Sequence, residues 1–264
     1  MDSVNKTLYI PLYAKSYVSK RGLFLSDPKA EAIWDAEGFP LKGKSKSKWL
    51  ACYLGIRSAV FDQWVNQQIA DAPDAAVIHI GCGLDSRVLR VGAADTPWYD
   101  VDFPAVIEER KRYYAESASY RMIAGDVREN SWLTQISQTK CAIVVAEGVS
   151  MYLTSNALHT LTANLCAHFD RVVCLMDCYT DFAAKMSKYR NPVQDVGVTE
   201  VYGIDDPALL QHEGWVFVTE HTMTPPEYIN ALHGTEKLIF KTLYAGQVSK
   251  KMYRLFEYRK VPAS

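Results

Sequence analysis

The stretch from Ala76 to Asp102 constrains the fold of this chain more than any other segment. It begins with a short apolar run, continues through the tight turn Gly81-Cys82-Gly83, and then becomes helical in character. A second apolar run follows and ends in the carboxylates Asp100 and Asp102. The order strand, glycine turn, helix, strand and acid is typical of a nucleoside-binding βαβ unit.

The details of this turn indicate which nucleoside it would bind. Gly81 and Gly83 lack a Cβ, so a ligand can approach the backbone closely. A dinucleotide fingerprint has a third glycine where this chain has Ser86, and Asp85 would repel a pyrophosphate. A nucleoside with a cationic or zwitterionic tail fits better. We therefore expect S-adenosylmethionine (SAM), with its demethylated product S-adenosylhomocysteine (SAH).

From Ala75 onward, short apolar runs alternate with polar, helical segments. The pattern predicts a doubly wound, Rossmann-like α/β fold with a mostly parallel seven-stranded sheet. Ligand-binding residues should gather at the carboxyl ends of its strands, where the glycine turn, Asp100 or Asp102, Asp126 and Glu147 stand. The predicted strands are 76–80, 97–101, 120–124, 141–146, 171–177, 214–220 and 253–259, and the predicted helices are 85–92, 104–116, 155–168 and 225–244.

The first 70 residues read as a helical extension of a single domain that spans 1–264. One helix should begin at Asp27-Pro28, and a long amphipathic helix should cover 49–69. The aromatic segment Leu8–Tyr17 precedes these helices and suggests a lid over a small-molecule site. Its Tyr9, Tyr13 and Tyr17 would contact the substrate, together with Tyr152 further along the chain. The core would then occupy 75–264, with a covering insertion around 179–213.

Composition excludes several classes of partner. The net charge is −1, so no basic field favours nucleic acid. No apolar run approaches the length of a membrane span, and the N-terminus lacks the features of a secretory signal. The six cysteines include no Cys-x-x-Cys pair. We interpret them as reduced thiols, which predicts a cytoplasmic protein. The partner that we expect is a small molecule. The pattern does not define an oligomeric state.

Gly38–Ser45 matches a phosphate-binding loop letter for letter. Such a loop must follow a buried strand and surround phosphates with consecutive backbone N–H groups. Here the preceding segment is charged and looks helical, and Pro40 lacks one of the required donors. We therefore interpret this segment as a solvated basic loop rather than a triphosphate site.

The strand-end residues resemble the leucine carboxyl methyltransferase family, whose bacterial members include tetracenomycin-type polyketide O-methyltransferases. The matching strings lie in order between Tyr9 and Leu153, and Asp-x-Asp-Phe-Pro and Glu-Gly-Val-x-Met-Tyr-Leu are the most unusual. They are Tyr9–Lys15, Ser26–Ala30, Arg57–Asp62, Ile80–Arg87, Tyr99–Pro104, Gly125-Asp126 and Ala146–Leu153.

The resemblance implies roles for individual residues. Gly81, Cys82 and Gly83 would approach the methionine part of SAM, and Asp102 or Asp100 would hold the ribose beside Phe103. Asp126 and Val127 would lie at the adenine, and Glu147 would face the ammonium group. Lys15 and Arg57 would reach the SAM carboxylate, with Arg87 as a further contact. The chain lacks the Arg-Gly-Tyr-x-x-Arg string of eukaryotic protein-phosphatase methyltransferases near 48–53.

These observations favour methyl transfer from SAM to a carboxylate or hydroxyl of a small molecule. A carboxylate acceptor needs no base, whereas a phenol would benefit from one. No histidine stands at a strand end to serve as that base, so catalysis by proximity is expected. The alternatives are a protein C-terminal carboxyl methyltransferase, a non-catalytic SAM-binding protein, a nicotinamide-dependent oxidoreductase and a nucleoside triphosphatase.

Overall fold

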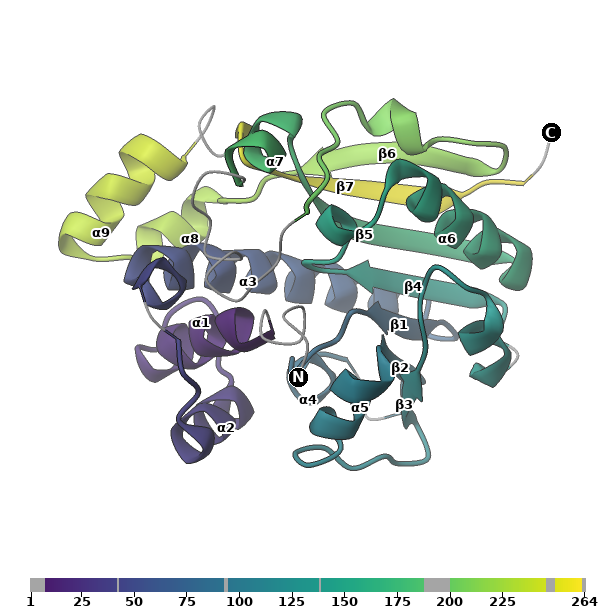
Figure 1. Cartoon of the computed structure of the whole chain (residues 1–264), viewed down its shortest axis with the longest axis horizontal. Coiled ribbons are helices and arrows are strands. Elements are labelled where there is room, and N and C mark those ends of the chain that lie inside the picture. The colour runs from purple at the N-terminus through teal and green to yellow at the C-terminus, as the bar shows by residue number, and fades with distance from the viewer. Residues whose placement is uncertain are drawn as a thin grey trace.

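The computed structural model describes residues 8–41, 43–92, 95–137, 139–187, 200–245 and 250–262. Its strands are β1 (Ala76–Ile80), β2 (Trp98–Asp102), β3 (Tyr120–Ala124), β4 (Cys141–Ala146), β5 (Arg171–Tyr179), β6 (Trp215–His221) and β7 (Tyr253–Lys260). They form one sheet in the order β3-β2-β1-β4-β5-β7-β6, shown in Figure 1. Strands β1 to β5 pair in parallel, and β7 runs antiparallel to β5 and β6. The predicted α/β fold class is thus confirmed.

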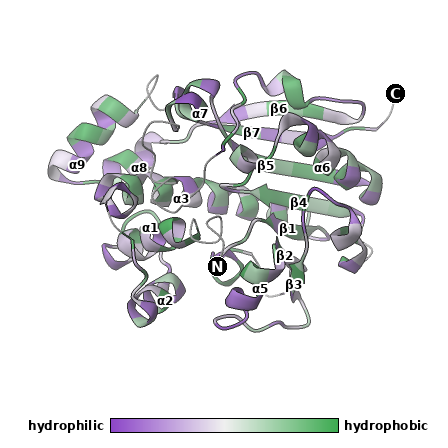
Figure 2. Cartoon of the chain, in the orientation of Figure 1, coloured by the Kyte–Doolittle hydropathy of each residue, from purple (hydrophilic) through white to green (hydrophobic). Residues whose placement is uncertain are grey.

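Both faces of the sheet are covered, as its apolar strands require. In β1, Val77 belongs to one hydrophobic cluster, while Ile78 and Ile80 belong to the cluster on the other face. Strand β4 divides in the same way, with Ile143 on the first face and Val144 on the second. Figure 2 shows the resulting hydrophobic colour along the central strands. Polar groups that must meet ligand or solvent are therefore confined to the strand ends.

The predicted N-terminal helices are present. They are α1 (Tyr9–Lys20), α2 (Pro28–Glu37) and α3 (Lys48–Asp71). The Asp27 carboxylate caps α2 by accepting the Ala30 N–H at 2.9 Å, and Gly38 ends it in a left-handed conformation with φ 59°. Helix α3 has a buried residue at nearly every position from Ala51 to Val65, because it lies between the sheet and the other two helices.

The remaining described helices are α4 (Arg87–Arg90), α5 (Pro104–Arg110), α6 (Ser155–His168), α7 (Asp181–Ser187), α8 (Pro226–Ala231) and α9 (Gly234–Ile239). Short turns η2 (Gly43–Lys46), η3 (Ser131–Gln135), η4 (Ser150–Tyr152), η6 (Pro207–Leu210) and η7 (Phe240–Tyr244) complete the set. Of the expected cover around 179–213, the structure describes α7 and 200–213, and the rest lies outside the described residues.

Three helix predictions were too long. The helix expected over 85–92 spans only α4, because Val91 turns to extended backbone and packs into the core. The helix expected over 104–116 ends at Arg110. The single helix expected over 225–244 is broken after α8, where Leu232 and His233 adopt extended backbone. The break inserts Leu232, which is fully buried, into the core, so tertiary packing overrides local helical preference.

Candidate active site

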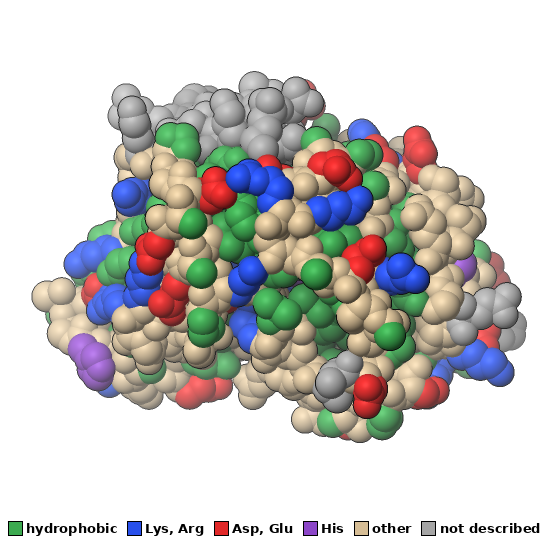
Figure 3. All heavy atoms as spheres, turned by 90° about the horizontal axis from the view of Figure 1, so that it is seen from below, with side chains coloured by type: hydrophobic (Ala, Val, Ile, Leu, Met, Phe, Trp, Pro, Cys, Tyr) green, Lys and Arg blue, Asp and Glu red, His purple; other side chains and the backbone are tan. Residues whose placement is uncertain are grey.

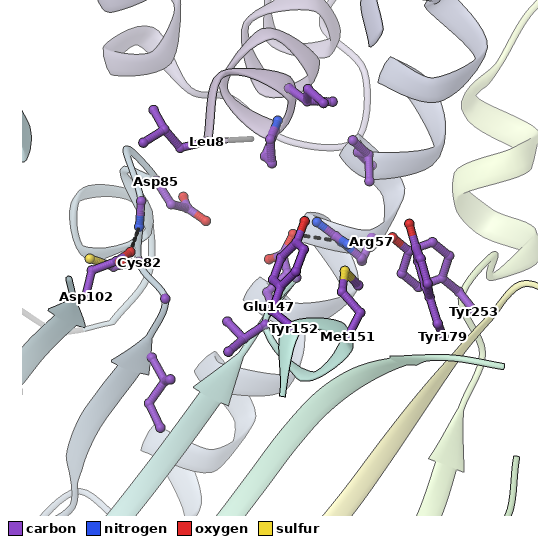
Figure 4. Close-up of a pocket in the computed structure, with 18 of the residues that line it drawn as sticks. Leu8, Arg57, Cys82, Asp85, Asp102, Glu147, Met151, Tyr152, Tyr179 and Tyr253 are labelled. Carbon is purple, nitrogen blue, oxygen red and sulfur yellow. Dashed lines mark hydrogen bonds and ion pairs between the residues drawn. The ribbon is translucent and has the colours of Figure 1, made fainter. Parts of the chain in front are cut away.

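A cavity of about 900 Å³ opens at the carboxyl ends of the parallel strands. Its walls come from the glycine turn after β1, from the ends of β2 to β5, and from α1, α3, α7 and η7. In the space-filling view of Figure 3, hydrophobic side chains gather around a hollow on this face. The close-up in Figure 4 shows Asp102 and Cys82 on one side, Arg57 and Glu147 in the middle, and Tyr179 and Tyr253 on the other side. Most, but not all, of the residues predicted for the site line this cavity.

The glycine turn has the backbone that the sequence predicts. Gly81 and Gly83 have φ angles of 65° and 51°, a left-handed region that side chains with a Cβ avoid. A Cβ added to Gly81 would lie 2.2 Å from Val149 Cγ2. Cys82, between them, is 2% exposed and lines the cavity, and burial raises the pKa of its thiol well above the usual range. Cys82 is therefore a neutral part of the wall.

Asp102 is held at the end of β2 by backbone donors. Its carboxylate accepts the Gly83 N–H and the Phe103 N–H, each at 2.8 Å, so its orientation is fixed toward the cavity. Burial raises the pKa of Asp102 to about 6, despite these hydrogen bonds. Phe103, 39% exposed, lines the cavity beside it.

Asp100, the alternative ribose contact, does not line the cavity. It lies two residues before Asp102 on β2 and is fully buried. Its carboxylate accepts hydrogen bonds from Trp98 Nε1 at 2.9 Å and Tyr120 Oη at 2.6 Å. Arg110 also pairs with it, so its oxygens are occupied by structural partners. This corrects the sequence interpretation in favour of Asp102.

Asp126 and Val127 lie beyond β3, at the same end of the cavity as Asp102. Asp126 pairs with Arg128, whose guanidinium lowers the pKa of the Asp126 carboxyl. Val127 is 9% exposed and presents an apolar surface. A carboxylate beside an apolar contact is suited to a flat, amine-bearing ring.

The middle of the cavity is built from paired charges. Arg57 donates from Nε to Glu147 at 3.0 Å and from Nη1 to Asp177 at 2.7 Å. Arg87 also pairs with Glu147. The two guanidinium groups hold the pKa of Glu147 far below its usual range, even though burial opposes this. Lys15 forms an ion pair with Asp85, with 3.4 Å between Nζ and Oδ2, and both residues line the cavity.

Arg87 is not a direct cavity contact. Its side chain is fully buried and donates from Nε to Asp62 at 2.7 Å and from Nη1 to His79 Nε2 at 3.1 Å. The role expected for Arg87 at a cofactor carboxylate is therefore wrong in this structure, since its guanidinium is engaged beneath Glu147. Burial lowers the pKa of His79, which keeps this histidine neutral.

The opposite end of the cavity is aromatic and apolar. Tyr152, predicted from the sequence, lines it from η4. Tyr179 and Tyr253 pack edge to face with ring centroids 4.5 Å apart, and the ring centroid of Tyr53 lies 5.9 Å from that of Tyr253. Tyr179 and Met186 belong to the segment 179–213 that was expected to cover the site, whereas sequence reasoning missed Tyr53, Met151, Tyr244 and Tyr253. They come from elements far apart along the chain and share no local pattern that could have revealed them.

The tyrosines of α1 do not line the cavity, which corrects their expected role. Tyr9 stacks on Phe39 with ring centroids 4.1 Å apart, and Tyr13 packs against Trp34 at 4.9 Å. Tyr17 accepts a hydrogen bond from Arg21. The helical period turns this face of α1 toward α2, while Leu8, Leu12 and Lys15 face the cavity.

The segment 38–45 has the geometry of a connection rather than of a phosphate loop. Helix α2 precedes it, and Gly43 begins the short turn η2. Lys44 and Lys46 are exposed there. Lys44 is exposed, as expected, but Leu41 and Ser45 are buried, so the described part of this segment is only partly solvated.

SAM fits the residues that line the cavity. The turn at Gly81 has no room for a side chain, and the desolvated Asp102 carboxylate faces a space open to a ribose. The described lining contains four carboxylates, Asp85, Asp102, Asp126 and Glu147, and three cations, Lys15, Arg57 and Arg128. This charge balance suits a ligand of net positive charge. Among the described residues, no group of His, Cys, Asp and Glu side chains could hold a metal ion.

Comparison with known proteins agrees with this geometry. Residues 5–166 match the family model of leucine carboxyl methyltransferase. The chain is 31% identical to the "Tetracenomycin polyketide synthesis O-methyltransferase TcmP" of Streptomyces glaucescens over 98% of this chain and 97% of the relative. Within the described residues, no helix is long and apolar enough to cross a bilayer.

Two solved structures share the fold. A duf574 family protein from Streptomyces avermitilis has a TM-score of 0.58 at 9% identity, covering 89% of this chain and 90% of that one. Magnesium protoporphyrin IX methyltransferase from Synechocystis, with bound SAH, has a TM-score of 0.52 at 12% identity, covering 97% and 100%. Fold, family match and relative agree, and the chain belongs to the leucine carboxyl methyltransferase family of SAM-dependent methyltransferases.

Proposed function

We propose that this enzyme transfers the methyl group of SAM to a carboxylate or hydroxyl oxygen of a small aromatic molecule of the polyketide type. One observation carries the proposal: a single cavity joins the glycine turn and Asp102 to an apolar end lined by Tyr53, Tyr152, Tyr179 and Tyr253. The relative named as a polyketide O-methyltransferase supports the choice of acceptor.

We assign the cofactor to the Asp102 end of the cavity. Gly81 and Gly83 would leave room for the methionine part, and Asp102 would accept hydrogen bonds from the ribose hydroxyls. Asp126 and Val127 would bind the adenine. Glu147 would face the ammonium group, and Lys15 and Arg57 the carboxylate of the same amino-acid moiety.

Bound SAM supplies a methyl group on a good, neutral leaving group. The chain must therefore align the acceptor oxygen with that methyl group and exclude water. The apolar wall of Met151, Tyr152 and Tyr179 does both at the acceptor end. The one histidine in the described lining, His79, is neutral and nearly fully buried under Arg87, so it is not a base for the acceptor. Catalysis by proximity suits a carboxylate acceptor best.

The structure gives less support to a protein C-terminus as acceptor. Capture of a chain terminus calls for a cation that is available to its carboxylate. Of the cations in the described lining, Lys15 and Arg57 are assigned to the SAM carboxylate and Arg128 pairs with Asp126, which leaves none for a chain terminus. A small aromatic acceptor needs no such clamp.

Methyl transfer to a panel of aromatic carboxylic acids and phenols tests the proposal, with a peptide ending in a free leucine measured beside them. We expect the mass gain of one methyl group on an aromatic acceptor. Met186→Trp, at a half-exposed position that lines the acceptor end, should reduce transfer while leaving SAM affinity unchanged. Leu238→Trp, at an exposed position on α9, is the control. A better reaction with the peptide, or SAM binding without any transfer, would contradict the proposal.

A further inference from the structure

A short helical segment between β6 and β7 supplies one wall of the acceptor end. We define the cap segment as Gly234–Tyr244, which comprises α9 and η7. Its second part, η7, is a short π-helix, a rare element that occurs mostly at functional sites. Leu243 and Tyr244 of η7 line the cavity, and the ring centroid of Tyr244 lies 5.5 Å from that of Tyr53. The position of the cap segment therefore sets the width of the acceptor end.

The cap segment is held to the rest of the protein by two buried side chains. Within it only Glu236 and Phe240 are buried, and they stand four residues apart, so they lie on one face of the helix. Phe240 stacks on Tyr244 with ring centroids 4.5 Å apart, and its ring centroid lies 6.5 Å from that of Trp49 on α3. The segment thus rests on one aromatic anchor and one charged anchor.

Arg21, which directly follows α1, is the main partner of the charged anchor. Its Nη1 donates to Glu236 Oε1 at 3.1 Å and its Nη2 donates to Oε2 at 2.8 Å, so the guanidinium holds both carboxylate oxygens. Arg21 also donates to Tyr17 Oη at 2.9 Å, which orients the guanidinium. The hydrogen bonds from Arg21 lower the pKa of Glu236 and keep it ionised. Lys48 lies farther from this carboxylate, at 3.7 Å, and its side chain is 48% exposed.

The buried carboxylate of Glu236 depends on this partner. Loss of one member of a buried ion pair leaves the other charge without compensation in a poorly solvated place, and this is strongly destabilising. Without Arg21, the Glu236 carboxylate would gain by reaching water. Apart from Glu236 and Phe240, the side chains of the cap segment are already exposed or half-buried, so an outward movement of the segment uncovers little of the core.

We propose that Arg21 and Glu236 are positioning residues that seat the cap segment, and that the seated segment completes the binding site of the methyl acceptor. Neither residue lines the cavity, so both act through Leu243 and Tyr244. The inference rests on the proposed function in taking the aromatic end of the cavity as the acceptor site. Because the cofactor is assigned to the opposite end, SAM affinity should not depend on the pair.

Three variants separate the pair from general effects on the fold. Arg21→Met leaves Glu236 buried without its main partner and should unseat the cap segment. The double variant Arg21→Met/Glu236→Met removes both charges and fills a similar volume, so the segment should be seated again. Lys20→Met breaks the exposed ion pair with Asp35 at the neighbouring position of the chain and is the matched control.

The KM for the aromatic acceptor reports the seated fraction. Only seated molecules bind the acceptor, so a seated fraction of about one tenth raises the KM about tenfold. We expect such a rise in Arg21→Met, with kcat and the calorimetric SAM affinity unchanged. The double variant and Lys20→Met should have the KM of the parent. Arg21→Lys, which keeps the charge but not the two parallel hydrogen bonds, should give a smaller rise and serves as the probe if Arg21→Met does not fold.

Hydrogen exchange of the backbone amides in 234–244 measures the seating without any acceptor. We expect faster exchange there in Arg21→Met and parent-like exchange in the double variant and in Lys20→Met. The inference is overturned if exchange in folded Arg21→Met or Arg21→Lys equals that of the parent, or if exchange is faster while the acceptor KM stays the same. Failure of the double variant to recover would show that Arg21 acts apart from Glu236 and would overturn the pairing. If the parent methylates no acceptor, the proposed function fails, and the exchange data still decide whether the pair seats the segment.

Discussion

Replacing Asp102 by asparagine should weaken SAM binding without destabilising the protein. The carboxylate accepts two backbone N–H groups at 2.8 Å and faces the cavity, where its remaining acceptor capacity is directed at a ligand. Hydrogen bonds to a charged group contribute about 1.5–3 kcal/mol, which is roughly ten- to hundredfold in affinity. We expect the loss in Asp102→Asn to lie in this range.

The pH dependence of SAM affinity gives an independent check. The pKa of Asp102 is about 6 in the ligand-free protein, so the carboxylate is ionised at pH 7.5 and largely protonated at about pH 5. A protonated carboxyl loses part of its acceptor capacity, and SAM affinity should therefore fall as the pH drops through 6. In Asp102→Asn this component of the pH profile should be absent.

The effect on stability has the opposite sign to the effect on binding. Because the pKa of Asp102 is higher in the folded protein than the ordinary value of 3.8, folding disfavours its ionised form. This cost is present above pH 6 and disappears as the pH falls below 4. The ligand-free Asp102→Asn protein should therefore have a melting temperature at pH 7.5 no lower than that of the parent. Calorimetric titration between pH 5 and 8, with thermal unfolding of ligand-free samples, measures both effects. Parent-like SAM affinity in Asp102→Asn, or an unchanged pH profile, would refute the reasoning.

Three further predictions, the first with a matched control variant, test other parts of the account. Gly81→Ala should lower the melting temperature and SAM affinity together, because φ of Gly81 is 65° and the new Cβ would lie 2.2 Å from Val149 Cγ2. Gly38→Ala is the control: φ of Gly38 is 59° and a Cβ there would have no atom within 4 Å, so this variant has the backbone strain without the clash. Asp126→Ala should weaken SAM binding about tenfold by calorimetry, and parent-like affinity would remove Asp126 from the adenine site. Lys44→Ala should change stability by less than about 0.5 kcal/mol and leave turnover unchanged, whereas loss of an ATPase activity present in the parent would restore the phosphate-loop reading of 38–45.

Much of the sheet and one end of the cavity could be predicted from the sequence. Strands β1, β3 and β4 lie where their apolar runs predict them, because buried parallel strands leave a continuous local pattern. The glycine turn and Asp102 follow from the same local logic. Asp102 was not separable from Asp100, since the choice depends on which carboxylate meets Trp98, Tyr120 and Arg110.

Of the acceptor end, Tyr152 and the covering segment 179–213 were predicted, but the meeting of its tyrosines could not be, for a physical reason. Tyr53, Tyr179 and Tyr253 meet because α3, β5 and β7 converge, and no spacing in the sequence encodes that meeting. The tyrosines of α1 were assigned to the site from composition, but Tyr9 and Tyr13 pack against Phe39 and Trp34, and Tyr17 accepts a hydrogen bond from Arg21. The family resemblance implied a cofactor contact for Arg87, whereas burial against Asp62 and Glu147 decides its role.

A crystal structure of the chain with SAH tests the central claim most directly, because it locates both ends of the cavity at once. We predict that the ribose hydroxyls lie against Asp102 and the adenine against Val127, with the sulfur directed toward Met151 and Tyr152. A nucleoside bound among Tyr179 and Tyr253, or in the segment 38–45, would contradict the account.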